Sequence, residues 1–172
     1  HTRIPGATVC FAVMRRWQKP GTWLKRYVYC ERQNVNKRGM EEKMSRKKCI
    51  TTEKAPAAIG PYSQAVVSDG TVFVSGQLGL DPESGKLVGP ETASQARQVL
   101  KNIEAVLAEA GLGMDDIVKI TIYLRDIGDF HTVNTLFTET FSEPYPARAC
   151  IQAAALPKAA EVEMEAIATV SG

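Results

Sequence analysis

The longest regular pattern in this sequence is a helical repeat between residues 91 and 110. Seven apolar residues recur at spacings of three and four: Ala96, Val99, Leu100, Ile103, Val106, Leu107 and Ala110. This spacing places an apolar stripe along one side of a helix, and Gly111 is a typical residue just beyond its end. Because such a stripe must be buried against another element, the rest of the chain has to supply a surface for it.

Segments with strand character lie on both sides of this helix. Before it, residues 62–80 place two β-rich runs around Asp69–Gly70, which is a strong hairpin signal. After it, a strand is predicted at 116–126, with an apolar face of Val118, Ile120, Ile122 and Leu124. A second helix is predicted from its N-cap Asp129 to Phe141, with an apolar face of Phe130, Val133, Phe137 and Phe141.

Two further strands, at 147–155 and 161–170, complete the pattern. The order β-β-α-β-α-β-β predicts an α+β fold in which two helices cover one face of a mixed sheet. The strands are rich in Val, Ile and Ala, so the face without helices also needs cover. Self-association is the simplest way to provide that cover.

The charge of the chain changes sharply at residue 50. Residues 1–50 carry thirteen Lys and Arg against three Glu, a net charge of +10, whereas residues 51–172 carry eight against sixteen, a net charge of −8. The first segment also shows no sustained helix or strand period. We therefore predict a basic, disordered N-terminal extension at 1–50 and one folded domain at 51–172.

Two origins fit this extension. It is either a mitochondrial transit peptide or translated sequence foreign to the native protein, with Met44 as the natural start. Its longest apolar run, 9–14, is too short for a membrane span or the apolar region of a signal peptide. The expected location is the cytoplasm or, with a transit peptide, the mitochondrion.

The cysteines and the basic residues exclude some kinds of site. Cys10, Cys30, Cys49 and Cys150 show neither paired spacing nor a nearby cluster of His, which argues against a zinc site and a disulfide framework. The interleaved basic and aromatic residues at 14–29 are the one feature that suggests nucleic acid. The acidic charge of the folded part argues against a broad phosphate-binding face there.

The predicted strand at 147–155 begins with a positive charge that has no obvious partner. Arg148 is the one charged residue between 144 and 155, and a guanidinium is costly to bury. The last strand places Glu161, Glu163 and Glu165 on one face. If the two strands are neighbours, one of these glutamates can lie near Arg148. Such a pair is either a cross-strand ion pair or a site where Arg148 holds a carboxylated ligand and the glutamate handles a proton.

Three other polar side chains are candidates, each with a plain structural alternative. Cys150 lies on the same strand face as Arg148, as either a small buried side chain or a reactive thiol. Tyr62 and Ser75 lie beside predicted turns, where capping and packing are equally good explanations. The common phosphate-binding, serine-hydrolase and zinc-protease motifs are missing from the sequence.

Five segments in this order resemble the Rid family of reactive-imine deaminases, most closely its RidA-type members. They are "APAAIGPYSQAV", "VFVSGQLGLDPESGKLV", "QARQVLKNIEAVLAEAG", "KITIYLRDIGDFHTVN" and "YPARACIQAAALPKAAEVEMEAIA". The resemblance covers residues 53–170 and none of the basic extension. It implies a chorismate-mutase-like fold, a homotrimer with active sites between subunits, and hydrolysis of 2-iminobutanoate and 2-iminopropanoate to 2-ketoacids and ammonia. It also implies that neither a metal nor a cofactor is needed.

The resemblance assigns roles to six residues. Arg148 matches the arginine that grips the substrate carboxylate, and Glu163 matches the carboxylate that positions or activates water. The remaining matches are to residues that line the cleft, and they are Tyr62, Ser75, Asn134 and Cys150. Animal members of the family have also been described as endoribonucleases or translation inhibitors. A trimer that binds small molecules, or acts like a chaperone without turnover, is the third interpretation.

Overall fold

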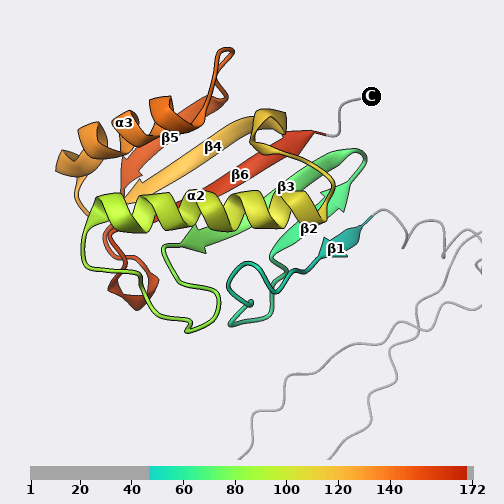
Figure 1. The fold of residues 1–172 in the computed structure, drawn as a ribbon, viewed down its shortest axis with the longest axis horizontal. Coiled ribbons are helices and arrows are strands. Elements are labelled where there is room, and N and C mark those ends of the chain that lie inside the picture. Colours follow the sequence, from blue (N-terminus) through green and yellow to red (C-terminus); the bar gives the residue numbers. More distant parts are fainter. Residues whose placement is uncertain (1–46, 170–172) are drawn as a thin grey trace, which may run out of the picture. The chain divides into compact units, whose positions relative to one another are not determined.

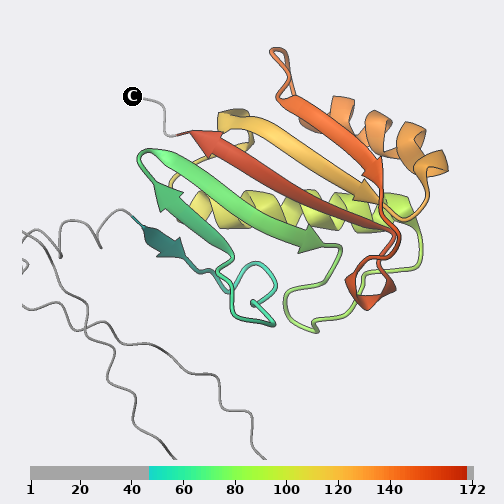
Figure 2. The ribbon, with the colours of Figure 1, turned by 180° about the vertical axis from the view of Figure 1, so that it is seen from behind.

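The structure is a computed structural model that describes residues 47–169 of the chain. A single six-stranded sheet carries both α-helices of this part on one of its faces (Figure 1). Within the described residues, no helix lies over the opposite face, which Figure 2 shows from behind. The predicted α+β fold, a mixed sheet with two helices on one face, is confirmed. The prediction of disorder concerns mainly residues 1–46, which lie outside the described part.

The strands are β1 (Lys48–Ile50), β2 (Ala65–Ser68), β3 (Thr71–Leu78), β4 (Ile117–Leu124), β5 (Ala147–Gln152) and β6 (Val162–Thr169). They lie in the order β1-β2-β3-β6-β4-β5, in which β4 and β5 run parallel and every other neighbouring pair runs antiparallel. The helices are α2 (Thr92–Glu109) and α3 (Phe130–Thr140), and 3-10 turns occupy Met114–Asp116, Ile127–Asp129 and Pro157–Ala159.

The N-terminal edge of the sheet begins earlier than the predicted domain boundary. β1 pairs with β2 in the register Lys48↔Val67 and Ile50↔Ala65. The three residues of β1 therefore belong to the sheet rather than to the basic extension at 1–50. An edge strand of this length with two exposed residues has too short a pattern to be recognised in the sequence.

The predicted hairpin is present, and its turn explains the Asp-Gly signal. Asp69 and Gly70 connect β2 to β3, with φ angles of 49° and 75°. Positive φ at both positions defines the type I′ turn, whose twist matches that of the two strands. The long β3 that follows pairs with β6 in the middle of the sheet.

The core lies between the helices and the sheet. α2 packs its apolar stripe against β3 and β6, as the helical repeat predicted. The largest fully buried side chains there include Ile103, Leu107, Ile120, Ile122 and Met164. Burial of each contributes about 1.5–3 kcal/mol to stability, so this layer holds the helices on the sheet.

Three details of the predicted elements are wrong. Val118 is 45% exposed, because an irregularity in the pairing between Ile117 and Lys119 turns Ile117 toward the core in its place. Phe130 is 41% exposed rather than part of the buried face of α3. Asp129 occupies the predicted N-cap position of α3, but its carboxylate accepts a hydrogen bond from the Thr92 hydroxyl at 2.6 Å rather than from a backbone N–H of α3, and so links the two helices.

The predicted strand at 147–155 is also too long, because β5 ends at Gln152. Beyond it the chain turns away from the sheet, and Lys158 and Ala159 have φ angles of 56° and 53°. The Lys158 ammonium donates a hydrogen bond to the Gly85 carbonyl at 3.0 Å. This excursion brings Pro157 to the edge of a cavity, before the chain returns to the sheet as β6.

Candidate active site

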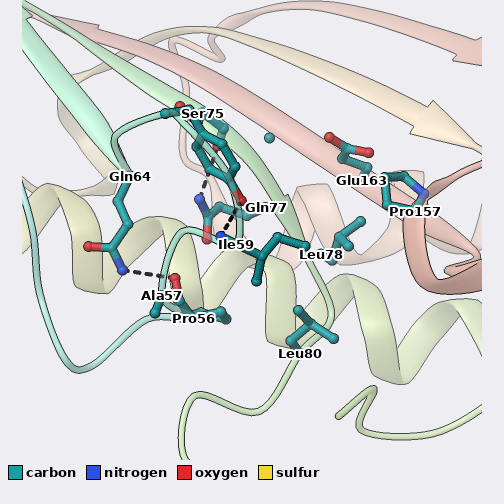
Figure 3. Close-up of a pocket in the computed structure, with 12 residues that line it drawn as sticks. Pro56, Ala57, Ile59, Gln64, Ser75, Gln77, Leu78, Leu80, Pro157 and Glu163 are labelled. Carbon is teal, nitrogen blue, oxygen red and sulfur yellow. Dashed lines mark hydrogen bonds between the residues drawn. The ribbon is translucent and has the colours of Figure 1, made fainter. Parts of the chain in front are cut away.

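A cavity of about 330 Å³ lies beside the junction of β3 and β6 (Figure 3). We call it the Glu163 pocket, and its lining residues are Pro56, Ala57, Ile59, Tyr62, Gln64, Ser75, Gly76, Gln77, Leu78, Leu80, Pro157 and Glu163. Apolar side chains form most of this wall, and Glu163 is the one carboxylate among the described residues that line it. Pockets of this kind, apolar with a few polar groups, suit small molecules.

The position of Glu163 follows from the alternation of β6. Val162 and Met164 are fully buried under the helices, so Glu163 and Glu165 point to the opposite face. Burial, together with the nearby Glu165 carboxylate, raises the pKa of Glu163 above its ordinary value. A carboxyl group with a raised pKa exchanges protons more readily near neutral pH.

An irregular step in β3 makes room for this carboxylate. The pairing of β3 with β6 shifts register between Val74 and Gln77, which leaves Ser75 and Gly76 in a bulge. A Cβ atom on Gly76 would overlap Oε1 of Glu163 and lie 3.0 Å from its carboxyl carbon. Gly76 is therefore the residue that lets the Glu163 side chain lie flat against the strand.

Tyr62 and Ser75, two of the predicted binding residues, line the same pocket. The Ser75 hydroxyl donates a hydrogen bond to the Ser63 carbonyl at 2.7 Å, so it retains only acceptor capacity for a ligand. The exposed Tyr62 side chain accepts a weak hydrogen bond from the Ile59 N–H at 3.4 Å. The pocket thus brings together Tyr62, Ser75 and Glu163 from three segments of the chain.

The other predicted residues form a second group, which we call the Arg148 cluster: Phe130, Asn134, Phe137, Arg148 and Cys150. Arg148 Nη2 donates a hydrogen bond to Asn134 Oδ1 at 2.9 Å. Its guanidinium carbon lies 5.4 Å from the Phe130 ring centroid and 4.8 Å from that of Phe137. Both distances suit cation–π contacts, so side chains of α3 hold the guanidinium in place.

Arg148 has no carboxylate partner within residues 47–169. The arginine ion pairs in this part of the chain are Arg97–Glu139 at 3.1 Å and Arg125–Glu161 at 2.7 Å. An oriented guanidinium with aromatic contacts and no counter-charge is suited to bind an anion from outside the chain.

Cys150 is a packing residue of the Arg148 cluster. Its half-buried side chain packs against the hydrophobic core, and both it and Cys49 are free thiols. Burial raises the pKa of the Cys150 thiol, an effect that the Arg148 charge opposes. The thiol is therefore protonated at neutral pH, which argues against a nucleophilic role.

The Arg148 cluster and the Glu163 pocket lie on opposite faces of the sheet. Arg148 is in register with the fully buried Ile120 and contacts α3, which places it on the helix face. Glu163 points to the face without helices. The hypothesis that β5 and β6 are neighbours is wrong, because β4 lies between them. Within one chain, Arg148 and Glu163 therefore do not form a single site.

The sequence did not predict that three further residues would contribute to the Glu163 pocket or the Arg148 cluster. Phe130 was assigned to a buried helix face, yet it stacks on Arg148. Its spacing of four residues from Asn134 and seven from Phe137 on one helix face was the available signal. Gly76 and Gln64 had no such signal, because their importance depends on contacts across the sheet.

In the part of the chain that the structure describes, no helix is long and apolar enough to cross a membrane. Within residues 47–169, no three His, Cys, Asp or Glu side chains gather in a way that could hold a metal ion.

Comparison with known proteins covers the same part of the chain. The family described as Endoribonuclease L-PSP matches residues 52–170. The 2-iminobutanoate/2-iminopropanoate deaminases of Bos taurus and Homo sapiens are 54% and 50% identical over 122 residues, which is 71% of this chain and 89% of each relative.

Solved structures agree with this assignment. RidA from an Antarctic Psychrobacter superposes with a TM-score of 0.70 at 49% identity, over 72% of this chain and 99% of that one. E. coli TdcF with bound serine has a TM-score of 0.67 at 42% identity, over 72% of this chain and 99% of that one. Sequence and fold therefore match over one continuous stretch of the chain. The chain belongs to the Endoribonuclease L-PSP family, which is the Rid family that its sequence resembles.

Proposed function

We propose that this protein hydrolyses 2-imino acids, such as 2-iminopropanoate and 2-iminobutanoate, to 2-ketoacids and ammonia. The observation that carries the proposal is the pair of complementary half-sites on one sheet. One offers an unpaired, oriented guanidinium, and the other offers a carboxyl group of raised pKa in an apolar pocket. A small acid with a reactive C=N bond needs both.

The Arg148 cluster supplies the carboxylate clamp of this proposal. A guanidinium binds a carboxylate through two parallel hydrogen bonds, which sets both the position and the plane of the substrate. Asn134 occupies one donor of Arg148, and the two phenylalanine rings restrict the rest of the side chain. The substrate is then held with little loss of side-chain freedom on binding.

The Glu163 pocket supplies the proton transfers. Water adds its oxygen to C2 of the iminium, and its proton passes to the Glu163 carboxylate. The same proton then goes to the amino nitrogen of the carbinolamine. As the C–N bond breaks and ammonia leaves, the hydroxyl proton passes to the Glu163 carboxylate and the C=O bond of the ketoacid forms. Ammonia then takes up this proton as ammonium. A conjugated iminium is already electrophilic, so a positioned water and one carboxylate are sufficient.

Two copies of the chain are needed to complete such a site. One sheet separates Arg148 from Glu163, and a substrate of a few heavy atoms cannot reach around it. A neighbouring copy that covers the helix-free face can bring its own Arg148 cluster to the Glu163 pocket. Phe73 and Ile151 are large apolar side chains exposed on that face, and burial against another subunit would stabilise the assembly. A homotrimer with a chorismate-mutase-like arrangement satisfies these requirements.

Serine bound to the related TdcF supports a ligand of this size and chemistry. An amino acid and a 2-imino acid share the carboxylate and a nitrogen on the adjacent carbon. The same clamp therefore suits both molecules, while hydrolysis requires the C=N bond of the imine.

The first experiment measures ammonia and ketoacid release from 2-aminoacrylate generated in situ, with the full-length protein and its Arg148→Ala variant. We expect the wild type to accelerate release and the variant to lose most of that acceleration. RNA cleavage that persists in Arg148→Ala, without acceleration of imine hydrolysis by the wild type, would favour the endoribonuclease interpretation. Ligand binding without ammonia release would favour a binding protein.

A second experiment tests whether the half-sites come from different copies. Arg148→Ala and Glu163→Gln subunits are unfolded together in equal amounts, refolded and assayed. Each parent is expected to be nearly inactive, while random mixing restores about a quarter of wild-type activity through interfaces with both intact halves. No recovery from a well-assembled hybrid would contradict a shared site.

A further inference from the structure

One buried side-chain amide holds the base of the loop at residues 52–64, which forms one wall of the Glu163 pocket. Gln64 is 3% exposed, and its Oε1 accepts a hydrogen bond from the Thr52 N–H at 2.7 Å. Its Nε2 donates to the carbonyls of Thr52, Ala55 and Pro56 at 3.0, 3.1 and 2.9 Å. The Gln64 side chain thus hydrogen-bonds to three residues at the beginning of the loop, as Figure 3 shows for the contact near Pro56.

The end of the loop is fastened to β3 at the bulge. The Ser75 N–H donates to the Gln64 carbonyl at 3.0 Å, and the Ser75 hydroxyl donates to the Ser63 carbonyl at 2.7 Å. Residues 52–64 are therefore attached at both ends, through Gln64 on one side and through Ser75 on the other. The same bulge places Gly76 beside Glu163, so loop and carboxylate share one support.

The tip of the loop has only local support. Ile59 and Tyr62 are exposed, yet both line the pocket. The hydrogen bonds at the tip run between its own residues, from the Tyr62 N–H to the Gly60 carbonyl at 2.8 Å and from the Ile59 N–H to the Tyr62 hydroxyl at 3.4 Å. The place of Tyr62 in the pocket wall consequently depends on how firmly the base is held.

We propose that Gln64 is a positioning residue for substrate binding: its side-chain amide sets the wall formed by Ile59 and Tyr62, and thereby the affinity of the pocket. The inference rests on the proposed function, because it takes this pocket as the place where the 2-imino acid binds. Gln64 lies at the pocket's edge and acts through the loop, whereas proton transfer belongs to Glu163. Loss of the amide should therefore weaken binding of substrate and transition state to the same extent.

The test uses Gln64→Glu, with Gln95→Glu as the matched control, both in the full-length chain. Gln64→Glu keeps an acceptor for Thr52 and removes the amide donors to three carbonyls. Gln95 is 1% exposed and also bridges backbone groups, since it accepts from the Glu161 N–H at 2.9 Å and donates to the Gly89 carbonyl at 2.7 Å. It therefore reports the cost of a buried carboxyl group away from the loop.

For Gln64→Glu we expect KM for 2-iminobutanoate to rise about tenfold while kcat stays within about threefold, a change of the size that one lost hydrogen bond gives. Gln95→Glu should leave KM unchanged. The ratio of the variant's KM to that of the wild type should increase with pH. The introduced carboxyl group can donate to a carbonyl while protonated, and it repels the carbonyls once ionised.

Hydrogen exchange of peptides from residues 52–64 supplies a readout that needs no turnover. It should be faster in Gln64→Glu than in the wild type or in Gln95→Glu. A KM and a loop exchange rate that both match the wild type would overturn the inference, as would a loss confined to kcat. If the wild type does not hydrolyse imines, the proposed function fails by itself. Loop exchange and binding of the stable ketoacid 2-oxobutanoate then decide the role of Gln64.

Discussion

The Arg148 cluster and the Glu163 pocket hold their charged groups in different ways. Arg148 lies on a strand and is clamped by side chains of one helix, so its surroundings come from a packed layer. Glu163 also lies on a strand, but its surroundings are a bulge and a long loop. A helix and a strand hold the cation. The carboxylate instead faces a loop whose tip forms hydrogen bonds only between its own residues.

Under the proposed function, this difference suits two steps with different requirements. A carboxylate clamp must be oriented before the substrate arrives, because its effect depends on planar, two-point geometry. The pocket around the reacting carbon has to admit substrate and water and then release ammonia. A loop with a fixed base and an exposed tip allows that exchange, provided that the base stays in place. Substitutions in the two regions should therefore fail in different ways.

The largest effect is expected at the carboxylate. Glu163→Gln keeps the size of the side chain and removes the proton acceptor, so kcat should fall by about 10²–10⁴-fold with little change in KM. Steady-state kinetics with in situ imine generation measures both constants. A change in KM alone would show that Glu163 contributes to binding rather than to proton transfer.

The second effect tests the geometry of the clamp. Arg148→Lys keeps the positive charge but loses the planar fork, so kcat/KM should fall about a hundredfold, close to the loss in Arg148→Ala. The same assay, with the Arg97→Lys variant as a control on an exposed arginine, provides the measurement. Near-normal activity of Arg148→Lys would mean that charge alone is sufficient.

Local patterns predicted most elements of this fold. The helical repeat of α2 and the alternation of β6 each describe one element and its buried face, and both are confirmed. Asp69–Gly70 identified the hairpin because its backbone requirement lies within two residues. Such signals are readable since the interactions that cause them are close in sequence.

The arrangement of the candidate site could not be predicted in this way, because it depends on contacts between residues that are distant in sequence. β5 and β6 follow each other along the chain, and consecutive strands are usually neighbours in a sheet. In this sheet, however, β4 lies between them. This order separates Arg148 from Glu163, so that a predicted pair lies in two separate groups of residues. Gln64 joins residues 8 to 12 positions away, and Gly76 matters because of a carboxylate on another strand. No periodicity reports contacts of that kind.

A third prediction concerns the space beside Glu163. Gly76→Ala places a methyl group where the Glu163 carboxylate lies, so the carboxylate must move and kcat should fall by about tenfold or more. Gly113→Ala is the matched control, because a Cβ there would meet nothing within 4 Å. Equal activities of the two variants would show that the position of the carboxylate tolerates a shift.

The smallest effect links the carboxylate to stability. The folded protein raises the pKa of Glu163 above its ordinary value, so the folded state binds this proton more tightly than the unfolded state does. That contribution to stability is fully present at acidic pH and is lost as the pH rises through the raised pKa. Glu163→Gln removes the penalty of ionisation, and its Tm should exceed that of the wild type at pH 7. The Tm difference should shrink as the pH falls toward about 4.5.

Thermal unfolding of both proteins across this pH range, followed by circular dichroism, measures the difference. Glu165→Gln is a useful control, because it removes the neighbouring charge that helps to raise the pKa of Glu163. A gain in Tm for Glu163→Gln, together with its loss of kcat, would mean that the pocket keeps a destabilising carboxylate for the sake of its chemistry. A lower Tm at pH 7 would instead assign Glu163 a stabilising contact, and the contrast with the firmly held Arg148 would then be much weaker.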